Sequence, residues 1–395
     1  MRRSACWRGS SAFMHGAGGE ARRRMKRLIL LGGGHAQLGV LASLAERPMA
    51  GCDVRLVTPF RRQIYSGMLP GWIAGHYPIE ACAIPLDELA ARAGVVFHQA
   101  AAVAIDPTRN SLRCDDGADL PFDLLSIDTG PVAAITDLPG AAQNALAIRP
   151  IEGFVAAWPL LVDRMLGVCR RFDLVILGAG AAGVELAFGI HHSAMTQGWS
   201  HVRVTLVGSD VLPLEGSPHK LRRQAAALLA QRGIGWLGGR KAQRIEPNHI
   251  CMEDGAAIDF DACLVVTGAA APTWPRTAGL DTDERGFIRV GPTLQSVSHQ
   301  HIFAAGDIAA YSHPRPKSGV FAVRAGPVLA HNLRAACEAR ALQAWQPQQR
   351  ALYLISTGNR HAFASWGRWA WHGPWVWSWK DRIDRQFVRR FRATG

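Results

Sequence analysis

The sequence lacks two features that would place a chain of this length in a common class. No uninterrupted apolar stretch approaches the roughly 20 residues that a membrane-spanning helix requires. No charged segment followed by a short apolar run opens the chain in the manner of a secretion signal. We therefore expect neither a secreted nor an integral membrane protein.

Closely spaced cysteines are also absent. The eight cysteines are scattered, without a CxxC or CxxxxC pair that would predict a redox disulfide or half of a zinc site. The histidines lack ligand spacing with cysteine or carboxylate partners. We expect a reducing compartment, chemistry that does not use a thiol, and no metal site.

Charged residues are few, at 19% of the 395, whereas 48% are apolar, which is enough to bury a core for two or three domains. The net charge of +13 is concentrated near the two ends. Residues 1–24 are rich in Gly, Ser and Arg and predict a disordered basic N-terminus. Without interleaved aromatic residues or a motif, this basic segment does not indicate nucleic-acid binding.

An internal repeat organises the chain after this basic segment. Residues 26–34, KRLILLGGG, predict a buried strand that ends in a glycine cluster, then a helix and the strand DVRLVTP. Residues 173–180, DLVILGAG, begin the same series, continued by AAGVELAFGI and HVRVTLVG. Each half is a strand, glycine turn, helix and strand, which is the pattern of a Rossmann dinucleotide-binding unit.

The segments downstream of the two units repeat as well. Each contains an Asp-Gly turn, at 116–117 and 254–255, and then a strand that ends in Thr-Gly, at 129–130 and 267–268. Two glycine fingerprints with the same continuation predict two homologous dinucleotide folds. The strand that ends at Gly306-Asp307 and the helix-compatible segment after it most simply complete the first fold, with the second fold inserted in it.

In the first unit, Gly32 permits the tight turn, and Gly34 allows the backbone to approach a pyrophosphate. The helix N-terminus at His35 supplies amide donors. Gln37 replaces the third glycine of the usual pattern, which loosens the match.

The second unit matches better, because Gly178, Gly180 and Gly183 all stand in GAGAAG. Glu185 follows on the same predicted helix. It is either an acid near the nicotinamide or an ordinary helix residue whose carboxylate binds a neighbour.

The strands after the two glycine turns lack the usual ribose-binding acid. The first ends at Thr58, so contacts to the adenosine ribose must come from elsewhere, such as Thr58 or Arg61. The second ends in Gly208, Ser209 and Asp210, which offer no arginine for a 2′-phosphate. This favours NAD over NADP.

With these motifs in place, residues from about 26 to 340 resemble flavoproteins of the pyridine nucleotide-disulfide oxidoreductase superfamily. The missing cysteine pair makes type II NADH dehydrogenases the nearer branch. Five segments resemble a bacterial NADH dehydrogenase-like subgroup that is associated with selenophosphate synthetase: GGGHAQ, YSGMLPGWIAGHY, RPIEGF, PKSGVFAVRAGPVLAHNL and YLISTG. The sequence contains no synthetase domain, so a link to selenium rests on resemblance only.

The resemblance implies an α/β fold with two Rossmann-like dinucleotide-binding domains, the NAD domain inserted in the FAD domain, and a small C-terminal domain with an amphipathic helix. We expect an FAD-binding domain at 25–148 and 285–341, an NAD(P)-binding domain at 149–284, and an acceptor or membrane-interface region at 342–395. The cofactor-binding candidates are Gly32, Gly33, Gly34, His35, Thr58, Thr129, Gly130, Gly178, Gly180, Gly183, Gly268, Gly306 and Asp307.

Asp307 has a specific expected use, and three further residues, Lys317, Arg324 and Glu185, are candidates for a catalytic role. Asp307 would accept hydrogen bonds from flavin ribityl hydroxyls, and it can cap a helix as well. Lys317 or Arg324, in the segment that flanks the flavin in the resembled proteins, would stabilise negative charge on the reduced flavin, with a surface cation as the alternative. Glu185 would serve the nicotinamide side.

The implied reaction is hydride transfer from nicotinamide C4 of NADH to flavin N5, followed by electron transfer to a quinone, without a redox disulfide. FAD and NAD(H) or NADP(H) are the expected cofactors. Two alternatives stay open: a soluble reductase for a protein, selenium or sulfur acceptor, and a flavin-based redox sensor.

The C-terminal region has an unusual composition. Residues 366–379 contain six of the 13 tryptophans, and residues 380–392 contain six cations against two acids. At helical spacing, one apolar stripe is expected, formed by Trp375, Trp379, Ile383, Phe387 and Phe391. This composition is typical of a helix in a membrane interface.

We therefore expect Trp366 to Arg392 to bind an anionic membrane surface, which would make the cytoplasmic protein peripheral on the inner face of the cell membrane. Docking of the stripe on the protein body or on the partner in a homodimer is the alternative.

Overall fold

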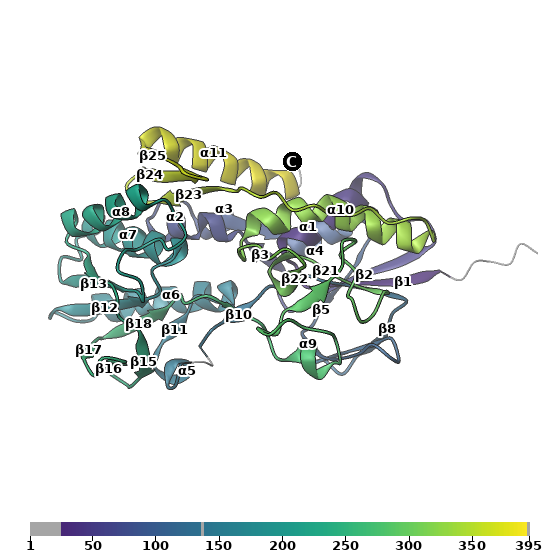
Figure 1. The fold of residues 1–395 in the computed structure, drawn as a ribbon, viewed down its shortest axis with the longest axis horizontal. Helices are drawn as coiled ribbons and strands as arrows, with labels where there is room; N and C mark the ends of the chain where they lie inside the picture. Colours follow the sequence, from purple (N-terminus) through teal and green to yellow (C-terminus); the bar gives the residue numbers. More distant parts are fainter. Residues whose placement is uncertain (1–24, 136–137, 393–395) are drawn as a thin grey trace, which may run out of the picture.

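The structure, a computed structural model, describes residues 25–135 and 138–392. The predicted basic N-terminus, 1–24, lies outside the described residues. Two parallel five-stranded sheets, each with a glycine loop at its centre, and a C-terminal antiparallel sheet organise the chain (Figure 1). The predicted α/β fold with two Rossmann-like units and a small C-terminal unit is confirmed.

The first sheet has the order β21-β9-β1-β2-β5, and all its neighbouring strands are parallel. The apolar strand β1 lies at its centre, where both faces of the sheet are covered, and its continuous apolar run suits this position. The last strand of the first sheet, β21, comes from the segment after the second sheet, so this segment returns to the first unit as expected. The strand bounds are β1 (Lys26–Leu31), β2 (Cys52–Thr58), β5 (Val96–Gln99), β9 (Leu124–Ile127) and β21 (Ile302–Ala304).

The second sheet repeats this arrangement in the order β11-β18-β12-β13-β14. Strand β12 corresponds to β1 and β13 to β2, with parallel pairing throughout. The strand bounds are β11 (Leu146–Ala147), β12 (Phe172–Leu177), β13 (Val202–Val207), β14 (Gly235–Leu237) and β18 (Ala262–Val265).

Helices pack against both parallel sheets (Figure 1). Helices α1 and α10 cross so closely that a Cβ on Gly39 would lie 3.1 Å from Gly326 Cα. The helices are α1 (His35–Glu46), α2 (Leu69–Ile73), α3 (Ile79–Cys82), α4 (Leu86–Arg92), α5 (Ala141–Asn144), α6 (Ile151–Leu166), α7 (Ala181–Thr196), α8 (His219–Gln231), α9 (Trp274–Thr277) and α10 (Gly319–Cys337), with short 3-10 turns η1 (Ser66–Met68) and η2 (Gly306–Ile308).

Each unit carries the small antiparallel meander that the repeat predicts. The Asp-Gly turns are equivalent in detail: Ala118 N donates to Asp116 Oδ1 and Ala256 N donates to Asp254 Oδ1, both at 3.0 Å. The meander strands are β6 (Ala102–Asp106), β7 (Ser111–Cys114) and β8 (Asp119–Pro121) in one unit, and β15 (Ala242–Ile245), β16 (His249–Met252) and β17 (Ala257–Asp259) in the other.

Three short strand pairs complete the two units. One of them, β10 with β19, joins the segments that follow the two Thr-Gly sequences. The pairs are β3 (Arg62–Ile64) with β4 (Ala83–Pro85), β10 (Val132–Ala133) with β19 (Ala269–Ala270), and β20 (Ile288–Val290) with β22 (Ala309–Tyr311).

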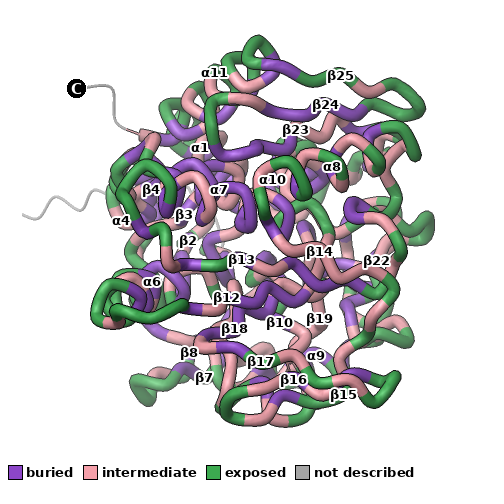
Figure 2. Tube along the Cα trace, turned by 90° about the vertical axis from the view of Figure 1, so that its left-hand side faces the viewer, coloured by how far each residue is buried: buried purple, intermediate pink, exposed green. Residues whose placement is uncertain are grey.

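The C-terminal unit lies along one side of both Rossmann-like units (yellow in Figure 1). It consists of β23 (Leu352–Ser356), β24 (Ala362–Trp366), β25 (Trp369–Gly373) and α11 (Pro374–Phe391). The residues of the central strands are mostly buried, whereas exposed residues lie in the outer turns and on the outward face of α11 (Figure 2). None of the helices in the described part of the chain has the length and apolar character to span a bilayer.

Candidate functional site

The loop after β1 has the conformation that a phosphate-binding turn requires. Gly32 adopts φ +92°, and a Cβ there would lie 2.5 Å from Asp128 O, so the turn admits only glycine. Helix α1 begins at His35, as predicted. Gln37 fits the third-glycine position because its amide is buried and donates to Ser126 O at 2.9 Å.

Gly34 is required for a reason that sequence reasoning missed. A Cβ on Gly34 would lie 2.3 Å from Asp128 Oδ1. The Asp128 carboxylate thus fills the space beside the loop, and its Oδ2 accepts hydrogen bonds from Ala36 N at 2.8 Å and Gln37 N at 3.1 Å. The neighbouring Gly33 packs against Leu86.

The second glycine loop follows the same plan. Gly178 adopts φ +112°, and a Cβ on Gly183 would lie 1.8 Å from Gly178 O, so the helix and the loop pack at backbone distance. A Cβ on Gly180 or on Gly268 would meet nothing within 4 Å. The loop therefore leaves open space in front of Gly180, where a pyrophosphate can approach.

The ends of the neighbouring strands differ from expectation in one respect. Thr58 is buried at the end of β2, while Arg61 pairs with Asp87 at 2.7 Å. After β13, Arg222 from α8 binds Asp210 at 2.7 Å, so an arginine does lie near the second ribose position. The sequence showed no arginine there because the arginine comes from the following helix.

Asp307 and Lys317 meet at the end of β21. Burial raises the pKa of Asp307, with Arg149 and Lys317 acting in the opposite direction. The Lys317 ammonium donates to Ala309 O at 2.6 Å, and burial lowers its pKa to about 8. Arg324, the other predicted cation, is exposed on α10, so Lys317 is the one that the structure places beside Asp307.

The Thr-Gly segments border the two loops. Asp128, which precedes Thr129, accepts Gly34 N at its carbonyl, and Thr129 itself is exposed. Gly130 adopts φ +74° and faces open space. In the second unit, Thr267 Oγ1 is buried without a partner among the residues described.

The residues around the first loop fit a flavin dinucleotide. His35 Nε2 is buried and has no hydrogen-bond partner within 25–135 and 138–392, and burial lowers the His35 pKa to about 4. His35 also lines a cavity of about 200 Å³ between α1, α10 and α11. The unpartnered His35 ring nitrogen, the glycine turn and the amide donors at the start of α1 are polar groups of the kind that bind such a cofactor.

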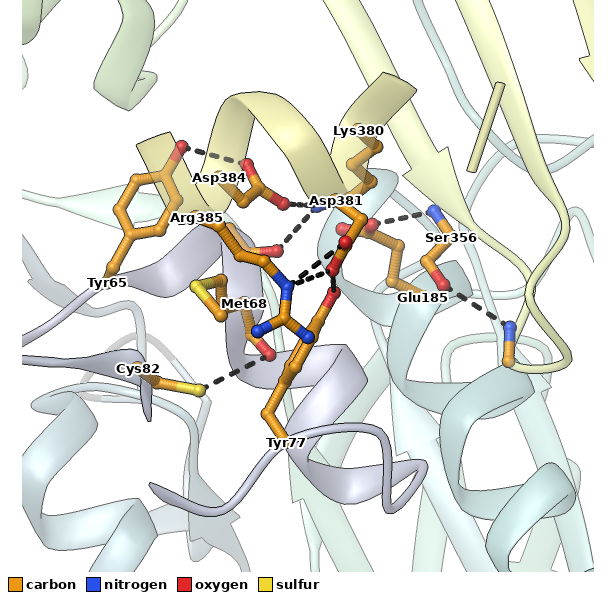
Figure 3. A network of polar contacts seen from close by, with 12 residues as sticks. Tyr65, Met68, Tyr77, Cys82, Glu185, Ser356, Lys380, Asp381, Asp384 and Arg385 are labelled. Carbon is orange, nitrogen blue, oxygen red and sulfur yellow. Dashed lines mark hydrogen bonds and ion pairs between the residues drawn. The ribbon is translucent and has the colours of Figure 1, made fainter. Parts of the chain in front are cut away.

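Glu185 lies on α7, where it faces the C-terminal unit. Its carboxylate accepts Ser356 N at 2.8 Å, and burial raises its pKa to about 7, against the field of Lys380. Lys380 is buried, with its ammonium 2.6 Å from both Asp384 Oδ2 and Gly67 O. Figure 3 shows this cluster at the contact between α11, α7 and the segment after β3.

The segment Tyr65 to Tyr77 fastens α11 at both of its tyrosines. Tyr65 Oη donates to Asp384 Oδ1 at 3.2 Å, and Tyr77 Oη donates to Asp381 Oδ1 at 2.6 Å (Figure 3). Arg385 binds Asp381 from the other side at 2.9 Å. The two helical acids that look solvent-exposed in the sequence therefore anchor the C-terminal helix to the body.

Comparison with known proteins places these features in a family. The family model described as pyridine nucleotide-disulphide oxidoreductase matches residues 26–326. The chain belongs to this family. The predicted recognition is thus confirmed, and the protein is an oxidoreductase by family.

Among the relatives, the demethylphylloquinone reductase NdbB of Synechocystis is 27% identical over 292 residues, which are 71% of each chain. Among solved structures, NDH2 of Plasmodium falciparum in complex with NADH superposes with a TM-score of 0.79 at 12% identity, covering 93% of this chain and 98% of that one. The sulfide:quinone oxidoreductase of Aquifex aeolicus gives 0.78 at 18% identity, covering 93% and 91%. The family implies a flavin and a nicotinamide nucleotide.

The tryptophans of this oxidoreductase's C-terminal unit form one exposed apolar surface, here called the Trp face. It consists of Trp366, Trp369, Trp371, Trp375, Trp379 and Ile383. An apolar groove of about 460 Å³, lined by Leu352 and four of these tryptophans, runs through it.

The predicted helical stripe is exposed at its beginning and packs on the protein body at its end. Trp375 and Trp379 are 55% and 39% exposed, but Phe387 packs on Tyr65, and Phe391 is buried. Near its end, α11 packs on β4, and the Phe387 ring contacts His35, the first residue of α1.

Two clusters were not visible in the sequence. Cys52 and Cys337 lie close together although 285 positions separate them, and their interaction lowers the pKa of Cys52 and raises that of Cys337. His98, Cys114 and Asp116 bring their polar atoms within 4.8 Å of one another, as a metal site could, whereas the sequence spacing had predicted no such group.

Proposed function

We propose that this protein is an FAD-dependent NADH:quinone oxidoreductase that works at a membrane surface without a redox disulfide. The observation that carries the proposal is the pair of glycine loops, at Gly32–Gly34 and Gly178–Gly183, at the carboxyl ends of two parallel sheets joined by β10 and β19. Each loop would bind one dinucleotide, and hydride transfer between two dinucleotides requires a binding site for each.

The first loop would hold FAD and the second NADH. His35, Gly130 and Asp307 would line the first, and Asp307 would accept hydrogen bonds from the ribityl hydroxyls. When bound, the flavin would take hydride from the nicotinamide and return electrons to an acceptor. Lys317 would hold positive charge beside Asp307, and the glycines would orient both dinucleotides, so that positioning supplies the rate.

Quinone is the proposed acceptor because the relatives and the site both favour it. Demethylphylloquinone, in the name of the Synechocystis relative, is a quinone. Reduction of a quinone consumes two protons, and Glu185, with a pKa of about 7, can hold or release one at neutral pH. The ion pair of Lys380 and Asp384 on α11 acts on Glu185 from the same cluster (Figure 3).

A membrane surface would bring the quinone to the protein. Exposed tryptophans flanked by arginines are typical of segments at the water–lipid interface. Arg368, Arg382 and Arg389 are exposed beside or near the Trp face. We propose that the Trp face enters the headgroup region of an anionic leaflet.

The cysteines support a mechanism without thiols. Cys52 begins β2 and Cys337 ends α10, so this pair lies at the amino ends of the parallel strands. The glycine loop is at the opposite, carboxyl edge of the same sheet. Replacement of all eight cysteines should therefore leave NADH oxidation nearly intact, and a collapse of turnover would contradict the thiol-free mechanism.

The deciding experiment is anaerobic. The visible spectrum of the purified protein is recorded, NADH is added, and a short-chain quinone follows. Bleaching of the flavin by NADH and rapid recovery with quinone is the expected result. Bleaching without recovery would reject quinone in favour of a soluble reductase, and a protein without flavin would reject the cofactor assignment.

Membrane binding is tested with vesicles of phosphatidylglycerol and phosphatidylcholine. The substitutions Trp375→Ser and Trp379→Ser together should weaken sedimentation with the vesicles about tenfold or more. Point changes are preferable to deletion of the helix, because α11 is anchored through buried groups. Leu160→Ser is the matched control, since Leu160 is an exposed apolar residue on α6. Equal binding of all variants would reject the Trp face as the contact.

A further inference from the structure

Asp128 occupies a central and unusual position in the first unit. It follows β9 and is 2% exposed. Its carboxyl group is enclosed on two sides, because a Cβ on Gly34 would lie 2.3 Å from its Oδ1 and a Cβ on Gly306 would lie 2.4 Å from the same oxygen. The acid is thus held between the glycine loop and the Gly306-Asp307 turn.

The two carboxyl oxygens have different surroundings. Oδ2 accepts Ala36 N at 2.8 Å and Gln37 N at 3.1 Å, in the first turn of α1. Oδ1 has no amide of α1 and faces Gly306. Burial, together with the charge of Asp307, raises the Asp128 pKa to about 7 in spite of the two amide bonds.

A flavin dinucleotide would add negative charge at this place. Its pyrophosphate carries two charges, and a Rossmann unit binds it at the N-terminus of the helix that follows the first strand. An ionised Asp128 carboxylate, bound to amides of the same helix turn, would repel the pyrophosphate at short range in a site from which water is excluded. A neutral carboxylic acid would keep both amide bonds at Oδ2 and present a proton at Oδ1 instead of a charge.

We propose that FAD binds only to the protein in which Asp128 is protonated, so that above neutral pH each FAD that binds takes up one proton from solvent at this residue. The proposal rests on the proposed use of the first unit for FAD. No electron moves in this step; the O–H bond at Asp128 forms when the pyrophosphate arrives and breaks when FAD leaves. The affinity for FAD then becomes a function of pH.

The other titratable groups around Asp128 can be separated from it. His35 stays neutral because its pKa is lowered to about 4, and burial together with the Asp128 charge raises the pKa of Tyr311 far above neutrality. Lys317, with a pKa of about 8, titrates in the same range, and together with Arg149 it acts on Asp307. A test must therefore distinguish Asp128 from Lys317.

The test measures FAD release from the holoprotein by flavin fluorescence on serial dilution, between about pH 6 and about pH 9. In the wild type, the FAD dissociation constant should rise up to about tenfold per pH unit above neutrality. The Asp128→Asn variant keeps an acceptor for Ala36 N and Gln37 N and cannot ionise. Near pH 6 it should bind FAD about as tightly as the wild type does, and near pH 9 its FAD dissociation constant should be lower than that of the wild type by about tenfold or more.

Proton uptake gives a second readout. When FAD is mixed with wild-type apoprotein near pH 8 in weak buffer, an indicator dye should report about one proton per FAD bound. Asp128→Asn should take up about one proton fewer, whereas Lys317→Met should retain the uptake. If Asp128→Asn does not fold, uptake that is retained in both Lys317→Met and Asp307→Asn assigns the proton to Asp128, and loss of the uptake in Asp307→Asn would overturn that assignment.

The outcomes distinguish this inference from the proposed function. FAD that binds with the same pH dependence and the same proton uptake in wild type and Asp128→Asn would overturn the role of Asp128 alone. Loss of the uptake in Lys317→Met would overturn it as well, because the proton would belong to Lys317. A wild-type protein that binds no FAD at any pH would overturn both proposals.

Discussion

Lys380 and Asp384 lie one turn apart on α11 and form an ion pair of 2.6 Å, with side-chain exposures of only 10% and 7%. The pair faces the body, where Tyr65 donates to Asp384 and Glu185 accepts from Ser356. Burial lowers the pKa of Lys380, but the fields of Asp384 and Glu185 outweigh it and raise this pKa. Burial raises the pKa of Asp384, while Lys380 and Tyr65 act in the opposite direction. The contacts of the pair join the C-terminal helix to the body of the protein.

Removal of Asp384 should loosen the C-terminal unit. In Asp384→Ala, Lys380 loses the partner that compensates its charge, and loss of one member of a buried pair costs about 3–5 kcal/mol. Urea unfolding of the variant and limited proteolysis near residue 374 measure the effect. Arg382→Ala, an exposed cation on the same helix, should change stability by less than about 0.5 kcal/mol. Equal stability of the two variants would contradict the anchoring role.

Much of the fold could be predicted because its signals are local. The apolar strand before Gly32, the same pattern before Gly178 and the repeated Asp-Gly turns each lie within a short segment. Their recurrence predicted two Rossmann-like units, and the return of the strand at 302–304 to the first sheet was predicted from the same pattern.

The contacts that could not be predicted join distant segments. Lys380 and Asp384 look like the solvent face of an amphipathic helix, because the acceptor at Gly67 and the acid at Glu185 lie far away in the sequence. Asp128 follows an ordinary buried strand, and only the fold brings its carboxylate to the first turn of α1. Charged residues buried by tertiary packing leave no periodic signal in a single sequence.

The two glycines of the second loop should respond differently to added side chains. Gly180→Val places its side chain in open space at φ −70° and ψ −174°, which valine can adopt, so the fold should persist. The same side chain would block an approaching pyrophosphate, and KM for NADH should rise about tenfold or more. Steady-state kinetics, with flavin content and Tm as controls, measure this.

Gly183→Ala is the contrasting variant. Its Cβ would lie 1.8 Å from Gly178 O, so the helix and the loop would have to separate. Lower Tm or insoluble protein is expected from this variant. A Gly180→Val protein with an unchanged KM would contradict nucleotide binding at this loop.

Asp210 should determine the preference for NADH over NADPH. Its carboxylate neutralises Arg222 at 2.7 Å and would repel a 2′-phosphate. Asp210→Asn releases the guanidinium charge, and the ratio of kcat/KM for NADPH to that for NADH should rise about tenfold, or ~1.4 kcal/mol. Glu246→Gln releases Arg244 from a comparable exposed ion pair of 2.8 Å in the meander of the same unit and should leave the ratio unchanged. A ratio that moves equally in both variants would reject the assignment.

Glu185 should make stability depend on pH. Its pKa is raised from 4.5 to about 7 by burial, so the native protein binds more protons than the unfolded chain between these values. Stability from this group is fully present below about pH 4.5 and is lost as pH rises to about 7, by about 3 kcal/mol at 1.36 kcal/mol per pKa unit. Urea unfolding of wild type and Glu185→Gln at about pH 5 and about pH 8 measures the difference.

Glutamine cannot ionise, so Glu185→Gln should lose less stability than wild type as the pH rises, even though other buried acids such as Asp128 contribute equally to both proteins. Glu215→Gln, at an exposed carboxylate, controls for the change of net charge and should follow the wild type. If Glu185→Gln and Glu215→Gln show the same pH dependence, Glu185 is already ionised in the native protein. The Lys380 charge would then outweigh burial at this position, and Glu185 could not supply a proton to a quinone at neutral pH.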